Sequence, residues 1–296
     1  MSEEQNRPKY AFVTGASSGI GYAISIELAE RGFTVFAGAR GVSKMQSLKK
    51  YGIIPLQLDV GSVESVKQCR DFIASQTSGY LDLLYNNAGV APTAPAIEIS
   101  EEALLQSINV NFVGVVRTCR EFSSLVIKAK GTIAFTSSTA GVLTIPFFAI
   151  YGATKAAVDR YADGLETEMR PFGVTVVNVV TGGVETGIEP ITNPLGPESR
   201  YYLPETLKFL KSFIGDEKGN TLMDVATYAK RTVEQVLNRP RFSRTWKVYE
   251  GYAAVPAYYI TTFLPDSLYK FLIDQAFGFR KISNAIVARS KKPATD

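Results

Sequence analysis

The sequence contains no histidine, and this absence excludes several classes of chemistry at once. Ser-His-Asp and Cys-His catalysis, histidine-ligated zinc and general-base catalysis by an imidazole all need that residue. The chain has only two cysteines, Cys69 and Cys119, which lie far apart in helix-like stretches and form no CxxC motif. We therefore expect a reducing, intracellular compartment, two core cysteines and no metal site. Proton transfer must then use Tyr, Lys, Asp, Glu or a lone Cys.

Long apolar runs and an excess of one charge are also lacking. The 32 basic and 28 acidic residues leave a net charge of +4, which is too small to argue for a nucleic-acid partner. No apolar run reaches the ~20 residues of a membrane-spanning helix. The nearest, residues 251–265, is uncharged but short and contains Pro256. Residues 1–9 are polar and lack the apolar core of a signal peptide. With 46% hydrophobic residues, the composition is typical of a globular protein with a sizeable core.

Strand-like and helix-like segments alternate from residue 9 to about residue 180. Short, nearly all-apolar strands are expected at residues 10–14, 33–37, 53–58, 81–85, 132–136 and 174–180, with a last edge strand at 247–249. Helices are expected at residues 20–31, 42–51, 63–75, 101–128, 151–169 and 221–238. This order indicates an α/β fold, a doubly wound parallel sheet whose ligand crevice lies beyond the carboxyl ends of the strands.

We expect residues 1–296 to form one domain with three parts. Residues 8–186 make the cofactor-binding and catalytic core. The stretch 187–220 changes character, and we interpret it as a substrate-lid insertion over the crevice. Residues 250–296 form a C-terminal extension that is first aromatic and then basic. The features that mark the insertion are Pro190, Pro194, Pro197, Pro204 and the Gly-Asp-Glu-Lys-Gly stretch at 215–219.

A glycine-rich turn joins the first expected strand to the first expected helix. It reads Thr-Gly-Ala-Ser-Ser-Gly-Ile-Gly over residues 14–21. Glycines let such a turn tighten and let the backbone approach a pyrophosphate at the helix N-terminus, and nearby hydroxyls add hydrogen bonds. The alternative is a glycine turn without a ligand. The residues expected to bind a dinucleotide here are Gly15, Ser17, Ser18, Gly19, Ile20 and Gly21.

The end of the second strand distinguishes NAD from NADP. An acidic residue there binds the ribose 2′-hydroxyl of NAD, whereas an arginine accommodates the 2′-phosphate of NADP. This chain has Arg40 and no acid, which predicts NADPH/NADP+, although Arg40 as a solvated loop charge is the alternative. Asp59 follows the third strand, where it would reach an adenine edge or serve as a helix N-cap. The contacts expected at these strand ends are Arg40, Asp59, Val60, Asn87, Ala88 and Gly89.

Ser138, Tyr151 and Lys155 form the most specific constellation. Tyr151 and Lys155 are four residues apart at the start of a helix, so they share one face, and Ser138 ends the neighbouring strand. A tyrosine pKa of ~10 makes a weak acid, but a nearby ammonium stabilises the phenolate and lowers that pKa. Tyr151 can then donate a proton to a carbonyl oxygen that Ser138 holds, as hydride arrives. Asn111 would bind a water that relays protons to Lys155.

Together these motifs resemble the short-chain dehydrogenase/reductase family over about residues 8–190. The matching elements are the glycine turn, the Asn-Asn-Ala-Gly stretch at 86–89, Asn111, Ser138 and the Tyr-x-x-x-Lys pair. The resemblance implies a single Rossmann-type domain with a seven-stranded parallel sheet and an NAD(P)-dependent carbonyl reductase or alcohol dehydrogenase. The family usually has Pro-Gly after the sixth strand, and Thr181 replaces that proline here. The cofactor contacts implied beyond it are Gly182, Val184 and Thr186.

Three further stretches, residues 83–89, 127–133 and 181–184, are similar to a fungal subgroup of this family, the NADPH-dependent 1-acyldihydroxyacetone-phosphate reductases. The resemblance implies a lipid-like ketone substrate and a place in the cytoplasm or on the cytosolic face of the endoplasmic reticulum or lipid droplets. A steroid or polyketide-type ketone stays open as the substrate. So does a non-redox NADP-binding role, although the intact catalytic set argues against it.

The role of the C-terminal extension is open to more than one interpretation. Large apolar and aromatic residues fill positions 251–279, and a basic tail follows from residue 280. Aromatic residues beside a cationic stretch suit peripheral association with an anionic bilayer. The same segment would also serve as a lid over the substrate pocket or as a dimer contact. We expect a small-molecule ketone as the substrate and a homo-oligomer as the assembled protein.

Overall fold

The computed structural model describes residues 7–186, 191–192, 195–214, 222–238 and 246–290. Its main sheet consists of β1 (Lys9–Thr14), β2 (Phe33–Ala39), β3 (Ile54–Gln57), β4 (Leu83–Asn86), β6 (Thr132–Ser138), β7 (Thr175–Thr181) and β9 (Trp246–Glu250). The strand order is β3-β2-β1-β4-β6-β7-β9, and all neighbours run parallel. The predicted doubly wound fold with seven parallel strands is thus confirmed.

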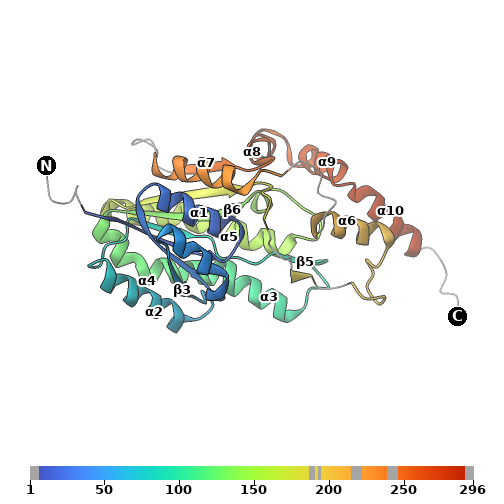
Figure 1. The fold of residues 1–296 in the computed structure, drawn as a ribbon. Helices are drawn as coiled ribbons and strands as arrows, with labels where there is room; N and C mark the ends of the chain where they lie inside the picture. The colour runs from blue at the N-terminus through green and yellow to red at the C-terminus, as the bar shows by residue number, and fades with distance from the viewer. Residues whose placement is uncertain (1–6, 187–190, 193–194, 215–221, 239–245, 291–296) are drawn as a thin grey trace.

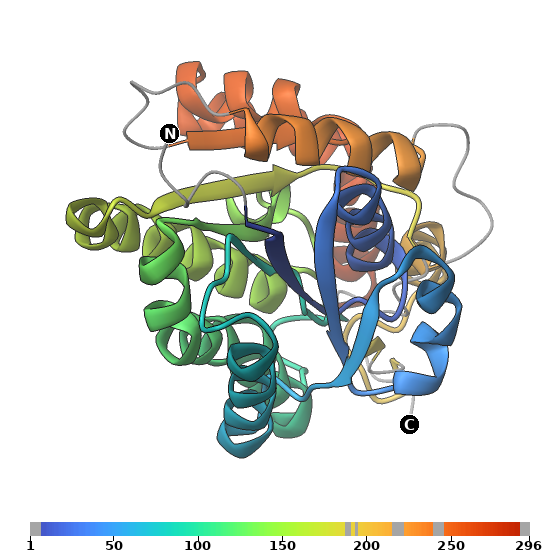
Figure 2. The same cartoon turned by 60° about the vertical axis from the view of Figure 1, so that its left-hand side comes forward.

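Helices cover both faces of this sheet (Figure 2). They are α1 (Gly19–Glu30), α2 (Val63–Gln76), α3 (Glu101–Ile108), α4 (Gly114–Ala129), α5 (Ala149–Met169), α6 (Pro204–Ile214), α7 (Val225–Leu237), α8 (Ala254–Phe263), α9 (Asp266–Ala276) and α10 (Phe279–Ser290). Successive strand residues point to opposite faces. Val13 therefore belongs to the core below α1 and α7, whereas Phe12 belongs to the core below α2, α4 and α5. Cys69 and Cys119 are buried and unpaired in the second core, as the sequence predicts.

Three expected helices differ from those observed. The helix predicted over 101–128 is interrupted by a π-helical turn, η3 (Asn109–Val113), because one turn holds an extra residue that apolar periodicity does not reveal. The helix predicted over 42–51 is a 3₁₀ helix, η2 (Val42–Tyr51). The last predicted helix is expected to begin at residue 221, which lies outside the described residues. The observed helix, α7, begins at Val225. The Asp224 carboxylate caps it by accepting a hydrogen bond from the Thr227 amide at 2.8 Å.

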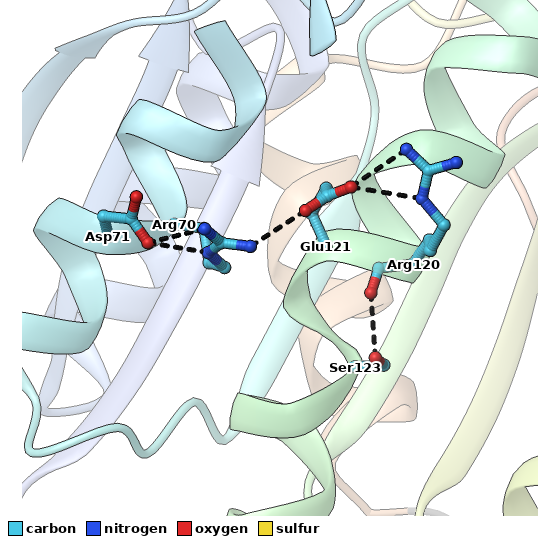
Figure 3. A network of polar contacts seen from close by, with 5 residues as sticks. All are labelled: Arg70, Asp71, Arg120, Glu121 and Ser123. Atoms are coloured by element: carbon cyan, nitrogen blue, oxygen red, sulfur yellow. Dashed lines mark hydrogen bonds and ion pairs between the residues drawn. The ribbon is translucent and has the colours of Figure 1, made fainter. Parts of the chain in front are cut away.

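The outer surface of the α2–α4 layer is charged and carries a network of ion pairs (Figure 3). Arg70 of α2 contacts Asp71 on its own helix and Glu121 of α4, with 2.9 Å between Arg70 Nη1 and Glu121 Oε2. Glu121 also pairs with Arg120, whose carbonyl accepts a hydrogen bond from the Ser123 hydroxyl. This surface is therefore a polar connection between two helices on the outside of the molecule.

The predicted lid insertion is described only in part. Its first described residues form β8 (Ile191–Thr192), which pairs with the short strand β5 (Pro92–Thr93). Further along the insertion, the Ser199 hydroxyl donates a hydrogen bond to Glu98. Pro190, Pro194 and residues 215–219 lie outside the described residues, and the boundaries of core, insertion and extension stay predictions.

α6, α9 and α10 lie toward the end of the molecule that carries the C-terminus, whereas α8 lies beside α7 (Figure 1). α6 lies beside α10 near the C-terminus (Figure 1), where Phe209, Leu210 and Ile282 form a small separate core with Phe147. α8 follows β9 directly, and α9 leads from it to α10. In the part of the chain that the structure describes, no helix combines the length and the apolar character needed to cross a bilayer.

Candidate active site

A cavity of about 380 Å³ opens at the carboxyl ends of the strands. Its walls include segments that follow β1, β2, β3 and β4, the ends of β6 and β7, and the start of α5. The strand order reverses at β1, and ligands of doubly wound sheets bind at such a point. The predicted site residues in its walls are Gly15, Ser17, Ser18, Ile20, Arg40, Asp59, Val60, Asn87, Ala88, Gly89, Ser138, Tyr151, Lys155, Gly182, Val184 and Thr186. Gly19, Gly21 and Asn111 contact these walls.

The glycine turn is shaped by its contact with the end of β4. Gly15 has a φ of 69°, and a Cβ there would lie 2.7 Å from the Ala88 Cα. A Cβ on Gly21 would overlap Asn87 Nδ2. That same nitrogen donates hydrogen bonds to the carbonyl oxygens of Thr14 at 3.1 Å and Gly15 at 3.2 Å. Side chains at positions 15 and 21 would therefore separate the turn from the strand end that holds it.

The start of α1 lines the cavity through Ser18 and Ile20. Ser18 is the N-cap residue, but its side chain makes no capping hydrogen bond within the described chain. The first amides of a helix lack intrahelical partners, and together with the helix dipole they attract an anion. Gly15 and Ser17 line the cavity just before this helix. These residues fit the pyrophosphate of a dinucleotide.

The cavity wall after β2 and β3 combines two cations with one acid. Arg40 is exposed and forms no ion pair within the described residues, and Lys44 of η2 lies in the same wall. Asp59 accepts a hydrogen bond from the Gly61 amide at 2.8 Å, whereas Ser62 caps α2. The alternative that Asp59 is the helix N-cap is therefore wrong. Two cations at this end suit a phosphate group.

Ser138, Tyr151 and Lys155 meet in the wall of the same cavity. Ser138 ends β6, and its hydroxyl shares a hydrogen bond with the Tyr151 hydroxyl. Lys155 follows one turn later on α5, with its Nζ 5.7 Å from the centroid of the Tyr151 ring. The ammonium donates a hydrogen bond to the Thr136 carbonyl oxygen at 2.7 Å. The arrangement places a phenol, a hydroxyl and an ammonium in the wall of one cavity.

Burial dominates the ionisation of this cluster. Burial raises the pKa of Tyr151, and the hydrogen bond with Ser138 lowers it only in part. Burial also lowers the pKa of Lys155 to about 8, and the nearby Asp159 carboxylate opposes that change. The lowering of the Tyr151 pKa expected from Lys155 is not the net effect in this geometry, because desolvation raises that pKa by more and the ammonium is directed to the Thr136 carbonyl. Tyr151 is thus protonated at neutral pH.

Asn111 holds the loop that follows β4. It is fully buried in the π-helical turn, and its Oδ1 accepts a hydrogen bond from the Val90 amide at 2.8 Å. Its Nδ2 donates to the Val90 carbonyl at 2.8 Å and to the Thr154 hydroxyl at 3.0 Å. A Cβ on Gly89 would lie 3.4 Å from Asn111 Oδ1 and 3.7 Å from Lys155 Nζ. Both side chains approach the same glycine, and the water relay between them stays a prediction.

The segment after β7 is held by the C-terminal half of the chain. The hydroxyl of Thr181, which replaces the family's proline, lies 2.6 Å from the Tyr228 hydroxyl of α7, and both residues are buried. A Cβ on Gly182 would overlap the Tyr252 carbonyl oxygen just before α8. These contacts fix the chain direction into residues 184–186, which continue along the cavity wall.

Sequence reasoning missed several wall residues. Lys44 had a detectable signal, since it is a second cation four residues after Arg40. Thr136 had none, because it acts through a backbone carbonyl that every residue type has. The missed residues are Ala39, Gly41, Lys44, Leu58, Val90, Ala91, Val110, Thr136, Ser137 and Thr181.

Comparison with known proteins agrees with this geometry. Residues 9–194 match the model of the family described as short chain dehydrogenase. The chain is 41% identical to the NADPH-dependent 1-acyldihydroxyacetone phosphate reductase of Saccharomyces cerevisiae, over 98% of this chain and 99% of that protein. It is 36% identical to the protein of the same name from Schizosaccharomyces pombe, over 81% of this chain and 82% of that one.

A solved structure supports the same assignment at the level of the fold. The short-chain dehydrogenase from Streptomyces avermitilis superposes with a TM-score of 0.73 over 97% of this chain and 100% of that chain, at 24% identity. The family match covers more than half of the present chain, and the yeast relative covers almost all of it. This protein therefore belongs to the short chain dehydrogenase family and is an oxidoreductase.

Proposed function

We propose that this oxidoreductase reduces a ketone to a secondary alcohol with NADPH. The observation that carries the proposal is the meeting of the glycine turn and the Ser138, Tyr151 and Lys155 cluster in one cavity. NADPH supplies the hydride when it is bound. The glycine turn, Arg40 and residues 87–89 would hold it, and the remaining chemistry is the proton transfer that this chain's own side chains perform.

Tyr151 acts as the general acid in this proposal. The ketone oxygen takes hydrogen bonds from the Ser138 and Tyr151 hydroxyls, and it gains negative charge as the carbon is reduced. Because burial raises the pKa of Tyr151, the phenol is protonated at neutral pH and is ready to donate to that oxygen. The Lys155 ammonium lies close to the ring and stabilises the phenolate that proton transfer leaves behind.

The preference for NADPH over NADH rests on charge. Arg40 and Lys44 both lie in the wall after β2, where the adenosine ribose binds in doubly wound dinucleotide folds. The 2′-phosphate of NADPH brings negative charge to this point, and Arg40 can hold it through two parallel hydrogen bonds. NADH offers only a hydroxyl there, so it gains less from either cation.

The substrate that we propose is a lipid-like ketone, 1-acyldihydroxyacetone phosphate or a similar compound. The support is the similarity, over most or nearly all of the chain, to two yeast proteins named for that substrate. A steroid or a polyketide-type ketone is the second candidate. A non-redox NADP-binding role is less favoured, because the Ser138, Tyr151 and Lys155 side chains are all present and lie together.

A ketone panel tests this proposal. The full chain is mixed with NADPH and 1-acyldihydroxyacetone phosphate, a steroid ketone, a polyketide-type ketone or a simple aryl ketone, and NADPH oxidation is followed. We expect the fastest oxidation with 1-acyldihydroxyacetone phosphate. Faster turnover of a steroid or polyketide-type ketone would favour the second candidate. Tight NADPH binding without oxidation of any ketone would contradict a reductase.

We further propose that the protein associates peripherally with anionic membranes, on the cytosolic face of the endoplasmic reticulum or of lipid droplets. Large apolar side chains of α8 and α9 are exposed, and Arg280 and Lys281 follow them at the start of α10. The Tyr269 hydroxyl of α9 lies 3.1 Å from the Thr144 hydroxyl, in the segment between Ser138 and Tyr151. A lipid substrate would thus meet the membrane close to the catalytic residues. The exposed side chains are Val255, Tyr258, Tyr259, Phe263, Leu268, Phe271 and Leu272.

Liposome flotation tests the membrane proposal. We expect the full chain to float with anionic liposomes at low salt, and high salt should weaken the binding. The double variant Phe263→Ser/Phe271→Ser should stay unbound. The matched control is Phe172→Ser, which removes a similarly exposed ring outside the C-terminal extension. This variant should still float with the liposomes. We also propose that the protein is a homo-oligomer, whose mass in solution is measured by light scattering. If the double variant has a lower mass than the wild type and neither protein binds liposomes, the exposed surface of α8 and α9 is a dimer contact.

A further inference from the structure

Phe147 has a backbone conformation that its side chain disfavours. Its φ is 64°, in the left-handed region, where a bulky residue is a rare outlier. The clash of Cβ with the backbone makes this region unfavourable for every residue except glycine. The side chain is also almost completely buried, with 7% exposed. Such a conformation persists only where the surroundings hold it.

Three aromatic rings from the C-terminal half surround the Phe147 ring. The ring centroids of Tyr201, Phe209 and Phe279 lie 5.8, 5.5 and 5.9 Å from that of Phe147, in tilted or edge-to-face pairs. Aromatic pairs in these arrangements are attractive beyond the apolar area that they bury. The Phe147 carbonyl also accepts a hydrogen bond from the Ala94 amide at 3.0 Å. Residues of α6 and α10 and Tyr201 therefore pack against the Phe147 ring, and the loop after β5 is bonded to its carbonyl.

Phe147 leads directly into the helix that carries Tyr151. It is followed by Phe148, the N-cap residue of α5. The Phe148 carbonyl accepts a hydrogen bond from the Gly152 amide at 2.7 Å, and its ring centroid lies 6.2 Å from that of Tyr151. Only three residues separate Phe147 from Tyr151. A change of φ at position 147 would therefore redirect the chain into the first turn of α5 and move the Tyr151 hydroxyl away from Ser138.

We propose that Phe147 is a positioning residue through which α6 and α10 set the place of Tyr151. The rings of Phe209, Phe279 and Tyr201, which lies just before α6, keep Phe147 left-handed, and the left-handed residue fixes the entry of the chain into α5. The inference rests on the proposed role of Tyr151 as the acid. It gives the C-terminal helices an effect on turnover without any contact with the reacting atoms, because small misplacements of an acid reduce rates strongly.

The first test compares Phe147→Ala with Phe147→Gly. Both remove the ring, but only alanine keeps the unfavourable Cβ in the left-handed region. We expect kcat with the fastest panel ketone to fall about tenfold in Phe147→Ala. Phe147→Gly should retain most of the wild-type kcat, and KM for NADPH should not change in either variant. Glycine normally weakens an ordered segment more than alanine does, so this reversed order is the signature of backbone positioning.

Hydrogen exchange gives a readout that needs no turnover. The Gly152 amide should exchange faster in Phe147→Ala than in Phe147→Gly, since its hydrogen bond to Phe148 depends on the entry into α5. Phe279→Ala should also lower kcat and the protection of the Gly152 amide from exchange. Phe277→Ala is the matched control and should change both less. Phe277 packs against Phe209, with ring centroids 6.3 Å apart, in the same small core.

The outcomes separate this inference from the proposed function. Equal kcat values and equal Gly152 exchange in Phe147→Ala and Phe147→Gly would overturn the positioning role. So would equal effects of Phe279→Ala and Phe277→Ala. If Tyr151→Phe keeps full turnover, the proposed function itself fails, whatever the Phe147 variants do. If Tyr151→Phe is inactive and the Phe147 variants behave alike, only the positioning role fails.

Discussion

The cavity and the C-terminal helices differ in what holds their side chains in place. At the cavity, Asn87, Asn111 and Lys155 each make hydrogen bonds to backbone groups at or just beyond the strand ends. On α8 and α9, by contrast, Phe263 and Phe271 are 68% and 54% exposed. The positions of the cavity side chains follow from the sheet topology. The role of the exposed rings on α8 and α9 depends instead on which membrane, substrate or partner that surface contacts. Changes at the cavity should therefore reduce the reaction itself, and changes on the exposed surface of α8 and α9 should alter access and partners.

The largest effect is expected from Tyr151→Phe. The substitution keeps the ring and removes the proton that the ketone oxygen needs. General acid–base catalysis contributes about 10²–10⁴-fold, so kcat for ketone reduction should fall by that factor. NADPH binding, measured by fluorescence titration, should be nearly unchanged. Ketone reduction at a near-normal rate would contradict the assignment of Tyr151 as the acid.

Much of the cavity could be predicted because its signals are local in the sequence. The glycine turn, Arg40 and the Tyr151–Lys155 spacing each lie within a few residues at the junction of a strand and a helix. Parallel strands then bring their carboxyl ends to the same edge of the sheet. The fold class follows from the same alternation of apolar strands and helices, whereas the count of seven strands is implied by the family resemblance.

The features that could not be predicted depend on contacts between distant segments. The left-handed conformation of Phe147 is held by rings more than fifty residues later in the chain. The hydroxyl pair of Thr181 and Tyr228 joins a strand end to α7. The π-helical turn at Asn111 inserts one residue without changing composition. None of these leaves a pattern within a short window of sequence.

A second prediction concerns the charge after β2. Arg40→Asp replaces the proposed phosphate ligand by a like charge, and such a juxtaposition costs several kcal/mol. We expect kcat/KM for NADPH to fall about 10²-fold and the preference to turn toward NADH, whose ribose hydroxyl can donate to the new carboxylate. Lys44→Ala should weaken NADPH use less and leave NADH use unchanged. Equal efficiency of the wild type with both cofactors would rule out this role.

A third prediction concerns Asp159, a nearly buried acid one turn beyond Lys155 on α5. It accepts hydrogen bonds from Ser137 and from Asn178, the latter at 2.7 Å. Burial lowers the pKa of Lys155 to about 8, and the Asp159 charge raises it. Asp159→Asn removes that charge and should lower the pKa of Lys155 further. The ammonium exists below its pKa, so the alkaline loss of activity should begin at lower pH in the variant.

The measurement for Asp159 is the pH profile of kcat/KM for NADPH, which reports ionisations of the free enzyme. Tyr151 should not interfere with the alkaline limb, because burial raises its pKa above the usual value for tyrosine. The control is Asp163→Asn, one turn further on, where the carboxylate pairs with Lys247 at 3.4 Å instead. An alkaline limb that does not move in Asp159→Asn, or that moves equally in Asp163→Asn, would refute the effect of the Asp159 charge on the pKa of Lys155.

The smallest effects are expected from surface ion pairs. One pair from the α2–α4 layer and one from α9 allow the stability of the two regions to be compared directly. Glu121 has 9% of its side chain exposed and pairs with Arg70 and Arg120, whereas Asp266 of α9 pairs with Lys270 at 71% exposure. Partly exposed pairs contribute ~0.2–1 kcal/mol. Glu121→Gln should therefore lower the free energy of unfolding by about 1 kcal/mol or less, and added salt should reduce the difference.

Asp266→Asn should leave the free energy of unfolding unchanged, because solvent already screens both partners. Urea denaturation at low and high salt measures both variants under identical conditions. The expected difference follows from geometry: the α2–α4 network joins two helices that pack on the sheet (Figure 3), whereas Asp266 and Lys270 lie on one exposed helix. Equal losses from the two variants would show that burial does not distinguish these ion pairs, and the contrast between core and C-terminal helices would then not extend to their surfaces.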